Sequence, residues 1–110
     1  MDAFEIGDLA QEREQSGERY LEFQKLPGLS TGIYHLPAES VDTQQPHTED
    51  EVYYVIAGKG AIQVADEDRL VGPGSIVFVE RHVDHRFHSI TEDLTIFVAF
   101  APPRGSLAEV

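Results

Sequence analysis

Between residues 20 and 101, short apolar runs are repeatedly interrupted by glycine, proline and acidic residues. Each run has the length of a strand and the interrupting residues suit turns, so the pattern predicts an all-β barrel or sandwich. By this rule we expect about seven to nine strands. The candidate strands are Tyr20 to Lys25, Gly32 to Leu36, Glu51 to Ala57, Gly60 to Ala65, Arg69 to Val71, Ser75 to Val79, His85 to Ile90 and Leu94 to Ala101.

The two ends of the chain have a different residue pattern from this β-rich part. Helix-forming residues dominate between Ile6 and Gln15, with Asp8 placed to cap the start of a short helix and Gly17 placed to end it. At the other end, two consecutive prolines should take residues 102–110 out of the sheet, because proline has no amide to donate. We therefore expect a single domain over residues 1–110, with a helical arm at 1–19, a barrel at 20–101 and a tail.

Two glycine-containing segments are expected to form turns between strands. Gly58-Lys59-Gly60 follows an apolar run, and glycines there permit the positive backbone angles of a tight hairpin. Val71-Gly72-Pro73-Gly74 has turn residues in the same relation to the next apolar run. The histidines and acidic residues around these two turns are the main candidates for chemistry.

The composition excludes several classes of partner and site. The chain has 20 acidic against 8 basic residues, for a net charge of -12, and such a surface repels nucleic-acid backbones and anionic lipids. A general contribution to solubility is the alternative explanation of that charge. The chain has no cysteine, which excludes disulfides, thiolate metal sites and cysteine nucleophiles. The start of the chain has no secretory signal pattern and no apolar run is long enough for a membrane helix, so we expect a cytoplasmic protein.

An acidic side chain is predicted on the inner face of the barrel. Alternate residues of a strand share a face, so Glu51 should point the same way as Tyr53 and Val55. An unpaired carboxylate costs several kcal/mol to bury, so Glu51 must face water or lie beside a positive group. The same alternation places His85 and Phe87 together on one face of a later strand.

These segments resemble the two motifs of the cupin superfamily, G(X)5HXH(X)3,4E(X)6G and G(X)5PXG(X)2H(X)3N. His47, Glu51 and Gly58 occupy the second histidine, the glutamate and the closing glycine of the first motif, and His85 occupies the histidine of the second. The departures from the motifs include Gln45 for the first histidine, Glu80 for the proline, His82 for the glycine and Ser89 for the asparagine.

The resemblance implies a cupin double-stranded β-helix, or jelly-roll barrel, with a metal ion inside it. His47, Glu51 and His85 would be ligands, and Gln45 would add an amide oxygen or orient a bound water or substrate. Two imidazoles and one carboxylate suit a divalent ion such as Fe²⁺, Mn²⁺, Ni²⁺ or Zn²⁺, and the affinity order does not select one of them. The remaining coordination positions would be open, as a catalytic site requires.

Simpler roles compete for several of these residues. His47 alone would be an ordinary surface histidine; its spacing from Glu51 favours ligation. His82 and His88 are expected in a turn and on the outer face, and Tyr53, Phe87 and Phe97 have the alternation of core residues. His35 lines the cavity or is a hydrogen-bonded structural histidine. Arg81 and Arg86 bind an anionic substrate at the barrel mouth or form surface ion pairs.

Three functions are compatible with this interpretation. The first is a metalloenzyme of the dioxygenase, isomerase or lyase type acting on a small molecule, with Glu51 as a ligand and Tyr53 or His35 as proton donor or acceptor. The second is a non-catalytic small-molecule or metal-binding sensor that lost its chemistry with the first histidine. The third is a structural dimerisation scaffold. Cupins of this kind commonly pair, so a homodimer is expected for all three.

Overall fold

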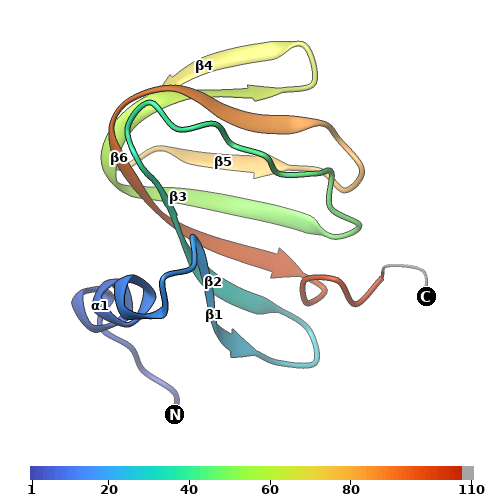
Figure 1. The fold of residues 1–110 in the computed structure, drawn as a ribbon. Helices are drawn as coiled ribbons and strands as arrows, with labels where there is room; N and C mark the ends of the chain where they lie inside the picture. Colours follow the sequence, from blue (N-terminus) through green and yellow to red (C-terminus); the bar gives the residue numbers. More distant parts are fainter. Residues whose placement is uncertain (108–110) are drawn as a thin grey trace.

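A computed structural model describes residues 1–107 and consists of one short helix followed by six antiparallel strands (Figure 1). The elements are α1 (Ile6–Ser16), β1 (Tyr20–Lys25), β2 (Ser30–Leu36), β3 (Asp50–Val64), β4 (Glu67–Val71), β5 (Ile76–Val79) and β6 (His85–Ala101). The strands pair in the order β1-β2-β6-β3-β4, and β5 pairs with the first part of β3. This is the mostly-β jelly-roll arrangement that the sequence predicted.

The strand count is lower than expected because two pairs of predicted strands each form one long, bent strand, whereas the turn predicted at residues 71–74 does separate β4 from β5. β3 runs through Gly58 without a hairpin, and its pairing with β6 shifts register between Val55 and Ala61. Gly58 has a φ of 94°, and a Cβ built on it would lie 2.1 Å from the carbonyl oxygen of Asp93 on β6. The glycine is therefore needed for close backbone contact at a bend rather than for chain reversal. β6 likewise continues from His85 to Ala101.

These bends allow the same two strands to form both halves of the barrel. The first part of β3 pairs with the last part of β6, through contacts such as Tyr53 with Val98. The last part of β3 pairs with the first part of β6, where Val64 is the partner of His85. Residues at the start of β3 and the start of β6 therefore lie in opposite halves of one bent sheet and face each other across the interior.

The interior is filled by the inward-facing residues of β2 to β6. The core consists of Tyr34, Leu36, Tyr53, Val55, Ile62, Val71, Val79, Phe87, Ile90, Leu94, Ile96, Val98 and Phe100. The alternation predicted for Tyr53 and Phe87 is confirmed, whereas Phe97 is only partly buried and lies on the other face of β6.

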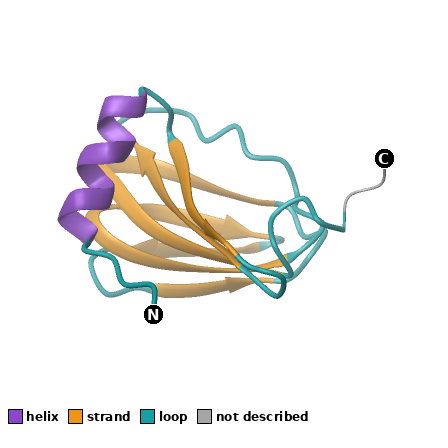
Figure 2. Ribbon diagram, turned by 90° about the horizontal axis from the view of Figure 1, so that it is seen from below, coloured by secondary structure: helices purple, strands orange, loops and turns teal. Residues whose placement is uncertain are grey.

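The helix lies outside the barrel, where it contacts β1 and β2 (Figure 2). Its buried Leu9 covers the outer face of this part of the sheet. The helix ends where expected, with Gly17 in the left-handed conformation, but the cap prediction was wrong: Glu5 is the N-cap residue and Asp8 lies in the first turn. Within residues 1–107, no helix has the length and apolarity needed to cross a membrane.

Candidate metal centre

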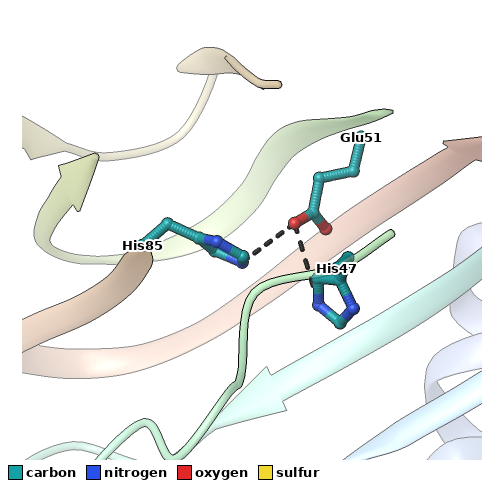
Figure 3. Close-up of side chains that lie close together, drawn as sticks. All are labelled: His47, Glu51 and His85. Carbon is teal, nitrogen blue, oxygen red and sulfur yellow. Dashed lines mark ion pairs between the residues drawn. The ribbon is translucent and has the colours of Figure 1, made fainter. Parts of the chain in front are cut away.

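Three side chains from separate segments converge inside the barrel (Figure 3). His47 comes from the loop before β3, Glu51 is the second residue of β3, and His85 is the first residue of β6. One candidate ligand atom from each lies within 4.8 Å of the others. Only 1% of the Glu51 side chain and none of the His85 side chain is exposed, and 15% of the His47 side chain is. The three residues that the first and second motifs placed together therefore do meet.

The contact between Glu51 and His85 is unusual for an ordinary ion pair. Nε2 of His85 lies 2.9 Å from Oε1 of Glu51. Nevertheless, neither atom, nor Oε2 of Glu51, has a partner in hydrogen-bond geometry among the described residues. Buried polar atoms are nearly always hydrogen-bonded, so this group of unpartnered atoms needs an explanation.

The other nitrogen of His85 limits the missing partner to a proton or a metal ion. Nδ1 lies 2.9 Å from the carbonyl oxygen of Val83, and a carbonyl only accepts, so Nδ1 carries a proton. In the neutral ring, Nε2 is then a bare lone pair beside a carboxylate oxygen, a repulsive contact unless a proton or a metal ion lies between them. A histidine that donates one nitrogen to a carbonyl and presents the other inward is the usual arrangement of a metal ligand. The residues present therefore fit a divalent cation.

The pKa values of the two histidines follow from their surroundings. Burial lowers the pKa of His47 and outweighs the nearby Glu51, so this ring is held neutral, as a ligand must be. Burial alone would also lower the pKa of His85, but its contacts with Glu51 and the Val83 carbonyl outweigh burial and raise the pKa. In the absence of a metal, a proton on Nε2 of His85 thus takes the place of the cation.

The amide beside the cluster belongs to Gln44. Its Oε1 lies 3.2 Å from Nε2 of His47 and accepts a hydrogen bond of 3.1 Å from the Tyr53 hydroxyl. Gln45, the residue expected from the motif, is exposed and has no hydrogen bond to the cluster among the described residues. The expectation rested on the position of the first histidine in the motif, but in this chain the segment is a loop containing Pro46, and Gln45 points to its exposed side.

A buried carboxylate, which the sequence analysis did not single out, orients this amide. Asp42 accepts hydrogen bonds from the backbone amide and the Nε2 of Gln44, at 3.2 and 2.9 Å. It also accepts from the Tyr34 hydroxyl and the Phe87 amide, both at 2.9 Å. With its NH₂ group held by Asp42, the Gln44 side chain can present only its oxygen to His47. The acid-to-amide spacing in Asp42-Thr43-Gln44 is too common in loops to have signalled this role.

The remaining residues predicted for the site lie in different places. Tyr53 is fully buried, and burial together with Glu51 raises its pKa well above the usual range, so its hydroxyl stays protonated. His35 does not reach the interior: it shares the outer face of β2 with Ile33, near Arg13 and Glu14 of α1. Its predicted role as a proton donor or acceptor at the cluster is therefore not compatible with its position.

The other candidates lie outside the cluster. His82 is exposed, and Nε2 of His88 lies 2.8 Å from Oδ1 of Asp68 at the surface, as expected for turn and outer-face residues. Arg81 forms an exposed ion pair with Asp50 at 3.4 Å. Arg86 lines a pocket next to His85 together with Asp42 and Asp84.

The barrel and its His-Glu-His cluster define a small β-barrel protein with a candidate internal metal centre. The family model described as a cupin domain matches residues 32–100, which is more than half of the chain and contains all three cluster residues. The chain therefore belongs to the cupin superfamily, as its motifs indicated.

The chain is similar to two proteins in sequence and to solved structures in fold. The chain is 44% identical over 105 residues to the protein SCO3923 of Streptomyces coelicolor, covering 96% of this chain and all of that protein. It is 30% identical over 85 residues to acireductone dioxygenase 2 of Arabidopsis thaliana, covering 73% of this chain but only 44% of the plant protein. Among solved structures, TT1209 from Thermus thermophilus superposes with a TM-score of 0.74 at 20% identity, covering 94% of this chain and 99% of that one. This last similarity supports the fold alone.

Proposed function

We propose that this cupin binds one divalent metal ion through His47, Glu51 and His85 and catalyses a metal-dependent reaction on a small molecule inside the barrel. The observation that supports this most strongly is the set of unpartnered atoms on Glu51 and His85. A divalent ion there supplies a Lewis acid with open positions, as dioxygenase, isomerase and lyase chemistry requires. The nitrogen and oxygen donors suit Fe²⁺, Mn²⁺, Ni²⁺ or Zn²⁺.

The residues around the cluster have distinct roles in this proposal. Gln44 presents its Oε1 next to His47 as a fourth ligand, in the role first expected for Gln45. Asp42 is a positioning residue that fixes the direction of this amide. Tyr53, kept protonated by burial, donates to Gln44 and holds its proton, so it acts as an orienting donor rather than as a base. Val98 and Phe100 form an apolar wall beside His47, against which the body of a small molecule can pack.

The oxygenase version has additional support from the distant dioxygenase relative, although the chain spans less than half of that protein. The test is turnover of a panel of small acids and phenols by metal-stripped protein and by protein reloaded with each of the four ions. We expect consumption of at least one compound that depends on the ion and is lost in Glu51→Gln. If the wild type binds metal yet consumes none of the panel in any loaded form, the enzymatic proposal is contradicted.

A non-catalytic metal or small-molecule sensor is the alternative, and the altered first motif favours it. A sensor would need no exchangeable coordination position. Water-proton relaxation by the Mn²⁺-loaded protein distinguishes the two functions, because the enzyme requires at least one exchanging water on the ion, whereas a saturated site has none.

We also propose the homodimer expected from the sequence. Val52 and Tyr54 on the outer face of β3 lie beside Phe78 and Ile76 of β5, and all four side chains are exposed. In a chain of net charge -12, this uncharged apolar face is where two copies meet with the least repulsion. A cytoplasmic location remains a prediction of the sequence.

A further inference from the structure

A pocket of about 600 Å³ opens beside the cluster and has a charge opposite to that of the protein. His47 and Gln44 are among the residues that line it. Two of its lining residues are arginines, Arg19 and Arg104, and only Glu18 is acidic. The chain as a whole has 8 basic against 20 acidic residues, so this is a local reversal of the prevailing charge. We call the site the arginine pocket.

Arg104 is held in place by the backbone of the segment that carries it. Its amide donates to Oγ of Ser30 at 2.9 Å. The amides of Gly105 and Leu107 donate to the two carboxylate oxygens of Glu49, at 2.7 and 3.1 Å. Glu49 is only 1% exposed, so these are buried, charge-assisted contacts that fix the segment over the pocket.

The ring of Tyr20 packs against the Arg104 side chain. The guanidinium carbon lies 4.9 Å from the centre of the Tyr20 ring, a cation–π contact, and 6.0 Å from that of Phe100. Tyr20 has room for this position because residue 32 is a glycine: a Cβ there would lie 2.2 Å from the Tyr20 hydroxyl oxygen. The Phe100 ring also packs against His47 with centroids 4.9 Å apart, which connects the Arg104 support to the cluster.

The charge of both arginines is available to a ligand. Neither Arg19 nor Arg104 forms an ion pair within residues 1–107, although one Arg19 nitrogen donates to the Val41 carbonyl at 2.9 Å. Arg81, one of the arginines first expected at the barrel mouth, is paired with Asp50. Arg86, the other, lies in the smaller pocket with two aspartates. A positioned guanidinium without an acidic partner, next to an apolar wall, suits a planar anion.

We propose that the arginine pocket binds a small organic carboxylate with an apolar or aromatic body, its carboxylate on Arg104 and its other end directed at His47. The body of the ligand lies among Tyr20, Tyr34 and Phe100, and Arg19 adds a second positive charge. This deepens the proposed function by naming its substrate class, because a ligand in this pocket reaches the metal centre from the His47 side. The binding itself depends on the arginines and does not require the metal.

The test measures binding of 2-hydroxybenzoate and of its uncharged analogue 2-hydroxybenzamide to the metal-stripped full chain by calorimetry. We expect the carboxylate to bind at least about tenfold more tightly than the amide, the difference expected for a charge-assisted contact. Arg104→Gln should lose about tenfold in carboxylate affinity, and Arg104→Lys should lose less because it keeps the charge without the planar fork. Arg86→Gln is the matched control and should bind as the wild type does.

Equal affinity for the two probes, or an unchanged affinity in Arg104→Gln, would overturn the inference. An equal loss in Arg86→Gln would also contradict it, because any arginine would then serve. The metal content of the same preparations is measured separately. Carboxylate binding without metal binding would support the inference about the arginine pocket and contradict the proposed metal-dependent function. Metal binding without carboxylate binding would support metal binding at the cluster and contradict the inference about the arginine pocket.

Discussion

Glu51 is the residue on which the site depends most, and its environment suits function better than stability. Both of its oxygens are buried without hydrogen-bond partners, 2.9 Å from a histidine nitrogen that presents a lone pair whenever the His85 ring is neutral. A buried carboxylate in this state destabilises the metal-free fold. The same group becomes stabilising when a cation binds, because binding to the native state alone favours folding.

We therefore expect Glu51→Gln to stabilise the metal-free protein while removing its response to metal. Above the raised pKa of His85, where its ring is neutral, the gain in free energy of unfolding should be about 1–3 kcal/mol, since an amide can donate to Nε2 of His85. Chemical denaturation with and without added metal measures both effects. His88→Ala, which alters only a surface pair, is the control and should change stability by less than about 0.5 kcal/mol. A less stable metal-free Glu51→Gln protein would contradict this account.

The raised pKa of His85 predicts that metal binding releases a proton. Because its pKa is raised in the metal-free protein, His85 carries two protons over a range of pH above its ordinary value, and a metal must displace the one on Nε2. Metal binding at about pH 6.5 should release a proton, and the release should fade as the pH rises past the raised pKa. Calorimetry in buffers of different ionisation enthalpy measures this release. Proton uptake, or the absence of proton release at about pH 6.5, would show that the metal does not displace a proton from Nε2 of His85.

Among the elements, β3 and β6 show what the sequence could and could not predict. Alternation placed Glu51, Tyr53, His85 and Phe87 on the correct inner faces, because burial of one face dictates a period of two. The glycines at 58 to 60 looked like a hairpin, since local sequence does not distinguish a chain reversal from a bend that brings a backbone close. The positions of Gln44 and Arg104 were not predictable either, because they depend on hydrogen bonds to Asp42 and Glu49 from distant or irregular segments.

Substitution of Gly58 tests the role of that bend. Gly58→Ala should destabilise the protein by about 2 kcal/mol or more, because the residue combines a φ of 94° with a Cβ position 2.1 Å from the Asp93 carbonyl oxygen. Gly28→Ala is the matched control, since a Cβ there has no atom within 4 Å, and it should stay within about 0.5 kcal/mol of the wild type. Urea denaturation compares them. Equal stability of the two variants would show that β3 does not need glycine to bend.

The whole molecule combines an acidic composition with an exposed apolar face formed by Val52, Tyr54, Ile76 and Phe78, and the proposed homodimer would cover that face. Light scattering after size exclusion should give about twice the 12.3 kDa of one chain. Phe78→Glu places a charge at the centre of the face and should give a monomer that is still folded, whereas Leu70→Glu, on the exposed part of β4, should remain dimeric. A wild-type monomer at high concentration would contradict the homodimer.

Metal-edge X-ray absorption on the purified protein shows whether an ion lies between His47, Glu51 and His85. We expect one divalent ion per chain with two imidazole nitrogens and additional oxygens in its first coordination sphere, and loss of that ion in Glu51→Gln. A protein that takes up no stoichiometric ion, or an ion whose coordination is unchanged in Glu51→Gln, would contradict this expectation.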